Sequence, residues 1–99
     1  MVAVIVRHKV KDYEAWKPEF DEHGEVRRRY GGTGHQIYRT AGNPNDLVAI
    51  CTFKDEAGAR GFMADPSLHV VMERAGVVSA PEISVTELTD ATEYELAIA

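Results

Sequence analysis

The sequence contains one cysteine and no long apolar run, and these two scarcities exclude several classes of protein. The single cysteine, Cys51, cannot form an intramolecular disulfide, which argues against a disulfide-stabilised secreted scaffold and fits a reducing, cytoplasmic location. No segment reaches the roughly 18 apolar residues of a membrane helix, and no basic leader precedes an apolar stretch. We therefore expect a soluble, cytoplasmic protein with no membrane partner.

Motifs that hold nucleotides or metals are missing as well. The sequence has neither GxGxxG nor GxxxxGKS/T, the glycine-rich loops that bind dinucleotides and nucleotide phosphates. Its four histidines, His8, His23, His35 and His69, lack the HxH, HxxxH or paired-cysteine spacings that bring metal ligands together. We therefore predict no metal site and no cofactor.

Basic residues are too few for a nucleic-acid-binding protein. Eleven lysines and arginines face sixteen acids, which leaves a net charge of −5. Binding to phosphate backbones needs a concentrated basic surface, so we exclude nucleic acid as a partner. The one basic run, residues 27–29, falls where we expect a helix to end, and cations there interact favourably with the helix dipole.

Four segments have the apolar, β-branched composition of strands: residues 2–6, 35–40, 47–53 and 83–88. Cys51 lies within the third segment, so we expect it to be a small buried residue rather than a reactive thiol. Between the second and third segments, residues 42–46 (Gly-Asn-Pro-Asn-Asp) have the composition of a turn. This order predicts an antiparallel hairpin.

Three helical segments lie between the strands. Asp12 is a candidate N-cap for the first, whose apolar face contains Tyr13, Trp16, Phe20, His23 and Arg27. Pro18 is the misfit, and it predicts either a helix start near Trp16 or a bend. Asp55 can cap a second segment through residue 63, and Asp65-Pro66 begins a third that ends at Gly76.

The resulting order β-α-β-β-α-β, with the second helix in two pieces, predicts an α+β, ferredoxin-like domain over residues 1–88. Its four-stranded antiparallel sheet would have helices on one face only. Because the strands are apolar on both sides, we expect the second face to be buried in a homodimer. Residues 89–99 form a C-terminal tail without a clear period, either loose or packed on a partner subunit.

Residues of these elements carry a resemblance to a known family. They are the run 6–13 (Val-Arg-His-Lys-Val-Lys-Asp-Tyr), Trp16, Phe20, Asp21, His23, the run 65–68 (Asp-Pro-Ser-Leu), Met72, the run 75–77 (Ala-Gly-Val) and Pro81-Glu82. Over residues 2–88 the chain resembles small bacterial proteins of the dimeric α/β-barrel superfamily, close to the antibiotic biosynthesis monooxygenase-like group. Some relatives carry a "cyclase" label. The resemblance implies that two copies pair as a dimeric α/β barrel.

The same resemblance leaves the reaction open, because one fold supports many functions. Members of the superfamily include cofactor-independent quinone-forming monooxygenases, haem-degrading enzymes, lactone isomerases and stress-responsive proteins. In the quinone-forming members, a pocket between helices and sheet holds a flat aromatic substrate, protein groups help remove a phenolic proton, and the substrate itself reacts with oxygen. The Asn, Trp and His of the haem-degrading members are not matched cleanly, because Trp16 lies on the first helix and Asn43 and Asn45 lie in the turn.

Two histidines are the candidate catalytic residues. His8 closes the first strand and His23 lies on the apolar face of the first helix, so both can point into one pocket beside Trp16 and Phe20. A histidine there can act as a general base because its pKa lies near neutral pH. The alternative is that His23 is a hydrogen-bonded core residue and His8 a polar group at a strand end.

Further substrate-binding candidates come from the second strand and the third helical segment. Tyr38 and Arg39 point to opposite faces of their strand, and Arg39 can bind an anionic substrate or pair with a carboxylate of a second subunit. His69 either closes the pocket or pairs with Glu73 one helical turn later. His35 begins the second strand and is expected to face solvent.

Two hypotheses follow from these observations. In the first, the chain is a small cofactor-independent monooxygenase or a cyclase-like isomerase that acts on a compact aromatic molecule. In the second, it is a non-catalytic dimeric module that binds a small molecule or responds to stress. A cavity near Trp16 with converging ionisable groups is required by the first hypothesis and not by the second.

Overall fold

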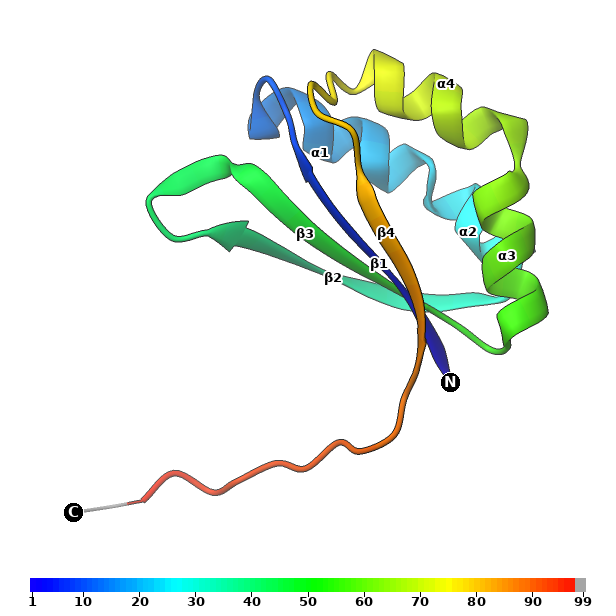
Figure 1. Ribbon diagram of the computed structural model, residues 1–99, viewed down its shortest axis with the longest axis vertical. Helices are drawn as coiled ribbons and strands as arrows, with labels where there is room; N and C mark the ends of the chain where they lie inside the picture. The colour runs from blue at the N-terminus through cyan, green and yellow to red at the C-terminus, as the bar shows by residue number, and fades with distance from the viewer. Residues whose placement is uncertain (98–99) are drawn as a thin grey trace.

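A computed structural model describes residues 1–97 of the chain. Its elements follow in the order β1 (Val2–Lys9), α1 (Tyr13–Glu22), α2 (Gly24–Arg29), β2 (Gly32–Thr40), β3 (Asn43–Phe53), α3 (Glu56–Ala64), α4 (Pro66–Arg74) and β4 (Glu82–Glu87). The strands form one sheet in the order β2-β3-β1-β4, and all neighbours are antiparallel. The helices cover one face of this sheet (Figure 1). The predicted α+β, ferredoxin-like fold is therefore confirmed.

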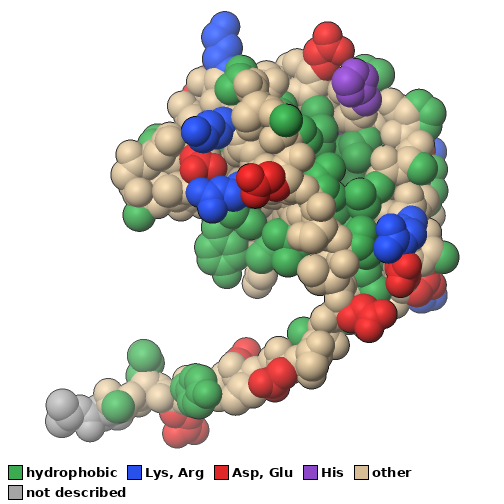
Figure 2. Space-filling model, viewed as in Figure 1, with side chains coloured by type: hydrophobic (Ala, Val, Ile, Leu, Met, Phe, Trp, Pro, Cys, Tyr) green, Lys and Arg blue, Asp and Glu red, His purple; other side chains and the backbone are tan. Residues whose placement is uncertain are grey.

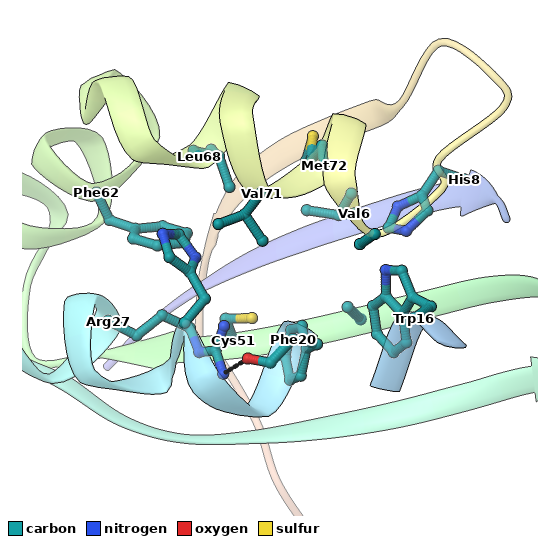
Figure 3. A pocket seen from close by; sticks show the side chains of 13 residues that line it. Val6, His8, Trp16, Phe20, Arg27, Cys51, Phe62, Leu68, Val71 and Met72 are labelled. Atoms are coloured by element: carbon teal, nitrogen blue, oxygen red, sulfur yellow. Dashed lines mark hydrogen bonds between the residues drawn. The ribbon is translucent and has the colours of Figure 1, made fainter. Parts of the chain in front are cut away.

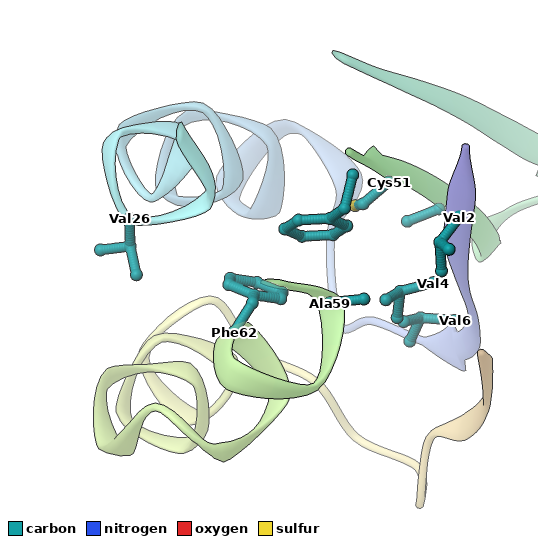
Figure 4. Close-up of a cluster of buried hydrophobic side chains, with 9 residues drawn as sticks. Val2, Val4, Val6, Val26, Cys51, Ala59 and Phe62 are labelled. Carbon is teal, nitrogen blue, oxygen red and sulfur yellow. The ribbon is translucent and has the colours of Figure 1, made fainter. Parts of the chain in front are cut away.

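The alternation of side chains along the two central strands places the core under the helices. On β1, Val2, Val4 and Val6 are buried, and each is separated from the next by a residue that points to the other face. The buried positions of β3 are Leu47, Ala49, Cys51 and Phe53. The valines of β1 and the buried residues of β3 pack with Phe62 and Ala59 of α3 (Figure 4). Cys51 is thus a buried residue, as its sequence context predicts.

Capping aspartates begin three of the helices, as the sequence predicts. The carboxylate of Asp12 accepts a hydrogen bond from the Glu14 amide, and that of Asp55 accepts one from the Gly58 amide. Asp65 accepts one from the Ser67 amide, with Pro66 in the first position of α4. Each cap is made within three residues of sequence, which explains why local patterns found it.

Pro18 does not delay the start of the first helix. The helix begins at Tyr13 and contains Pro18, and the interruption comes later, at His23, between α1 and α2. The start near Trp16 that the proline suggested is therefore not observed. Gly31, with a φ of 86°, then ends α2 and turns the chain into β2.

The hairpin between β2 and β3 is confirmed, but the predicted turn at residues 42–46 is wrong. The turn consists of Ala41 and Gly42, and β3 already begins at Asn43. Asn43 pairs with Thr40 of β2 beyond an irregularity at Arg39 and Thr40, and Asp46 pairs with Lys9 of β1, so β3 extends through this polar segment. Pairing with neighbouring strands has overridden the local preference for a turn.

Among residues 1–97, no helix covers the opposite face of the sheet (Figure 1). Ala3, Ile5, Val48 and Ile50 point to this open face and are only half-buried. After β4, residues 89–97 have no regular structure and lead away from the sheet (Figure 1). Within the part of the chain that the structure describes, no helix is long and apolar enough to cross a membrane.

Candidate functional site

A cavity of about 50 Å³ lies between the sheet and the helices, closed on the outer side by α4 (Figure 3). We call it the Trp16 cavity. Its lining residues are Val6, His8, Trp16, Phe20, His23, Arg27, Ala49, Cys51, Phe62, Leu68, Val71, Met72 and Ala75. Most of these side chains are apolar, so the few polar groups among them decide what the cavity can bind.

His8 is the polar group that lacks any partner. It is the last buried residue of β1, with 5% of its surface exposed. Both ring nitrogens are buried, and neither makes a hydrogen bond within residues 1–97. Burial lowers the pKa of His8, which keeps the ring neutral at pH 7. A neutral imidazole offers one donor and one acceptor, and here both are free to meet a ligand.

The aromatic wall of the cavity comes from α1. Trp16 lies 5.8 Å from the His8 ring, measured between centroids, and it stacks on Phe20 at 4.8 Å with planes 23° apart. The indole and the imidazole approach each other across the cavity (Figure 3). The helical spacing of Trp16 and Phe20 places both rings on the sheet side of α1. A flat apolar molecule would find a matching surface here.

His23 also lines the cavity, but neighbouring residues hold it. Its Nε2 lies 2.8 Å from the Ser67 hydroxyl, and that hydroxyl donates to the Asp65 carboxylate at 2.6 Å. Because the Ser67 hydroxyl donates its proton to Asp65, it can only accept from His23. Nε2 of His23 is therefore the donor in the His23–Ser67 hydrogen bond. Tyr30 donates to the other Asp65 oxygen at 2.6 Å. The hydrogen bonds from Ser67 and Tyr30 lower the pKa of Asp65 to about 2.

Arg27 is a cavity residue that sequence reasoning missed as part of the site. Its guanidinium lies over the Phe20 ring at 3.8 Å and donates to the Phe20 carbonyl oxygen at 2.8 Å (Figure 3). The sequence offered a signal, because Arg27 continues the apolar face of the first helix at a position where a charge is unexpected. The run 27–29 suggested a helix end instead, and Arg27 does lie in the last turn of α2.

Cys51 contributes its side chain to the cavity floor. Burial raises the pKa of its thiol, so the thiolate is disfavoured. A nucleophilic role is therefore unsupported.

Three of the predicted binding residues lie outside the Trp16 cavity. Arg39 points to the helix side of the sheet, where its guanidinium lies over the Tyr13 ring at 4.0 Å and donates to the Pro44 carbonyl. Tyr38 lies on the open face, with 57% of its surface exposed. His69 is exposed on α4, and no ion pair joins it to Glu73 in the described chain.

The remaining histidine, His35, is exposed as predicted and meets the Phe20 ring edge-on at 4.9 Å. Among residues 1–97, no three His, Cys, Asp or Glu side chains gather closely enough to hold a metal ion. The structure therefore brings together His8, Trp16, Phe20 and His23 from the predicted set, and adds Arg27.

No family model matches the chain, and no curated protein matches it by sequence. Solved structures do match. SnoaB, a cofactor-independent oxygenase from Streptomyces nogalater, superposes with a TM-score of 0.74 at 18% identity, over 91% of this chain and 94% of SnoaB. Rv0793 from Mycobacterium tuberculosis gives 0.69 at 16% identity, over 93% and 98% of the two chains.

A third match, NE2512 from Nitrosomonas europaea, is a protein of unknown function. It gives a TM-score of 0.70 at 21% identity, over 95% of this chain and 94% of NE2512. At these identities the comparison establishes architecture only. The chain has the ferredoxin-like fold of SnoaB and of a structure described as an antibiotic biosynthesis monooxygenase.

Proposed function

We propose that this chain is a small cofactor-independent enzyme, a monooxygenase or a cyclase-like isomerase, that acts on a compact aromatic molecule in the Trp16 cavity. The observation that carries the proposal is His8, a neutral buried imidazole with two unpartnered nitrogens in an aromatic-lined cavity. An unpartnered buried polar group is costly, and a ligand hydroxyl would satisfy it. The fold shared with the oxygenase SnoaB agrees with this kind of activity.

In the proposed reaction, His8 accepts the proton of a phenolic hydroxyl. The phenolate is electron-rich enough to reduce O₂ directly, so all the electrons come from the substrate. With 1-naphthol as substrate, one oxygen atom becomes the second quinone oxygen and the other leaves as water with the ring and hydroxyl hydrogens. The products are 1,4-naphthoquinone and water, and His8 returns to its neutral form. An isomerase would use the same proton transfer without O₂.

The cavity must widen to admit a ring. Its volume is about 50 Å³, whereas an engineered cavity of about 150 Å³ binds benzene. The wall best placed to move is α4, because none of its nine residues is fully buried. Two polar side-chain contacts join α4 to α1 and its C-cap. Ser67 contacts His23, and Arg74 forms an ion pair with Glu19 at 2.7 Å. We infer that α4 shifts outward when substrate enters.

The test is oxygen uptake with 1-naphthol, followed together with quinone absorbance. We expect turnover by the wild type and loss of at least 100-fold in His8→Phe, since a positioned general base contributes about 10²–10⁴-fold. His69→Phe is the matched control, because that histidine is exposed outside the cavity, and it should keep wild-type rates. Equal rates in wild type and His8→Phe would contradict the role of His8.

We also propose that the chain acts as a homodimer joined through the open face of the sheet. Ile5 and Ile50 are half-buried on this face, and covering them would remove their apolar surface from water and so stabilise the protein. Tyr94 and Leu96 in the tail are 91% and 93% exposed, and their spacing puts them on one side of an extended chain. Hydrophobic side chains, interspersed with acidic ones, lie along the tail (Figure 2). A second copy would bury both surfaces.

A non-catalytic binding module is the second candidate, and one observation favours it. Among the cavity's ionisable groups, His23 is hydrogen-bonded to Ser67, and burial keeps the Cys51 thiol protonated. His8 therefore has no second acid or base beside it to share a proton-transfer reaction. Saturable binding of 1-naphthol without oxygen uptake or isomerisation would select this candidate.

A further inference from the structure

Arg27 carries a positive charge into the protein interior without an acidic partner. Its exposed fraction is 6%. Within residues 1–97, no ion pair joins it to a carboxylate. The charge of Asp21 acts on Arg27, but both carboxylate oxygens of Asp21 bind Lys17, at 2.7 and 2.8 Å. Buried charges are rarely left unpaired, because desolvation is costly.

Arg27 lines two cavities. One is the Trp16 cavity, and the other is a second cavity of about 210 Å³ between α2 and the start of β2. Its walls are Asp21, Gly24, Arg27, Arg28, Gly32, Thr33, Gly34 and His35. Gly24 helps keep this side open, since a methyl group there would come 3.2 Å from Nη2 of Arg27. Arg27 is therefore a shared wall residue of the two cavities.

Positive charge gathers at this junction although the whole chain carries −5. Arg28 lines the second cavity beside Arg27. The charge of Arg27, after burial, lowers the pKa of both His23 and His35. Since Lys17 already compensates Asp21, the site favours an anion from outside the chain.

We propose that Arg27 binds the carboxylate of a compact apolar acid whose hydrophobic body occupies the Trp16 cavity. The planar guanidinium matches the two oxygens of a carboxylate, and the apolar lining beside Trp16 and Phe20 matches a small ring. The inference rests on the proposed role of the Trp16 cavity and narrows its ligand to an acid. The phenolic oxygen would face His8 and the carboxylate Arg27.

Benzoate and benzamide, which have nearly the same shape and differ in charge, provide the first test. Fluorescence of Trp16, the single tryptophan, reports binding of both probes. We expect wild-type protein to bind benzoate at least tenfold more tightly than benzamide. Arg27→Gln should remove this preference while keeping benzamide binding. Arg29→Gln, which removes an exposed charge of the same helix from a residue that lines neither cavity, is the matched control and should keep the preference.

A second measurement, the pKa values of His23 and His35, uses wild-type protein only. It therefore tests the proposal even if Arg27→Gln fails to fold. Benzoate bound at Arg27 would offset the charge that lowers the pKa of His23 and His35, so both pKa values should rise in an NMR titration. Benzamide should leave them unchanged. Asp65, Arg74 and Arg29 also act on the pKa of His23, and Lys17 and Asp21 act on that of His35, but their charges are the same with either probe.

The outcomes separate the two proposals. Equal affinity for benzoate and benzamide, with unmoved histidine pKa values, would overturn the anion site and leave the cavity as a ligand site. Binding of neither probe would overturn both proposals. Tighter benzoate binding that survives Arg27→Gln would place the anion elsewhere and would also overturn the inference.

Discussion

Replacing His8 with phenylalanine should raise the stability of the fold while removing ligand binding. The imidazole has one donor and one acceptor buried without partners. A buried polar side chain left without partners costs about 1–3 kcal/mol of stability. Phenylalanine removes both groups and keeps an aromatic ring against Trp16, and the adjoining cavity of about 50 Å³ has room for the larger ring.

We therefore expect His8→Phe to increase the free energy of unfolding by about 1–3 kcal/mol. For a domain of this length, each kcal/mol corresponds to about 4–8 °C in Tm, so Tm should rise by at least about 4 °C. Urea unfolding followed by circular dichroism measures the first quantity, and calorimetry measures the second. Stability gained on losing a residue is typical of functional sites, where polar groups are kept ready for a ligand.

His23→Phe is the matched comparison and should have the opposite sign. His23 donates to Ser67, so its replacement loses a hydrogen bond and should cost about 0.5–1.5 kcal/mol. A destabilised His8→Phe variant would refute the reasoning, because it would make His8 a structural residue. Equal effects at the two positions would refute it as well.

The remaining predictions concern pH, one glycine and the tail. Burial lowers the folded-state pKa values of His8, His23 and His35 below the unfolded value of about 6.5, so the unfolded chain binds more protons as pH falls. Stability should thus be greatest above pH 6.5 and decline below it, less steeply in His8→Phe, as urea titrations at several pH values would show. A methyl group on Gly58 would overlap the Tyr30 carbonyl, so Gly58→Ala should lower the free energy of unfolding, measured in urea, by about 1–3 kcal/mol. In the control Gly34→Ala, the new methyl group would lie 3.8 Å from the Thr52 hydroxyl, so the free energy of unfolding should hardly change. A chain ending at residue 90 should shift from dimer toward monomer in native mass spectrometry, and an unchanged mass would contradict packing of the tail on a partner.

Features set by neighbouring residues could be predicted from the sequence. Asp12, Asp55 and Asp65 cap their helices because a carboxylate reaches an amide two or three residues ahead. The valines of β1 and the apolar face of the first helix follow from periodicity alone. By contrast, β3 begins at Asn43, which pairs with Thr40 of β2, although local composition assigned this segment to a turn.

The site was predicted only in part, because its chemistry depends on distant partners. Sequence placed His8 and His23 near Trp16, but it could not tell that Ser67 holds one histidine while the other has no partner. The position of Arg27 was explained by the helix dipole, because the sequence does not show that the folded chain buries this arginine without an acid beside it. Tyr38 and Arg39 were correctly placed on opposite faces, and only the structure shows that Arg39 takes the helix side.

The most direct test of the central claim is a titration of Trp16 fluorescence with phenol, in wild-type protein and in His8→Phe. Trp16 lines the cavity and is the chain's single tryptophan, so its signal reports occupancy of this site. We expect a saturable change in the wild type and at least tenfold weaker binding in His8→Phe, because the hydroxyl loses its partner. A linear, unsaturable response in the wild type, or equal affinity in the two proteins, would contradict it.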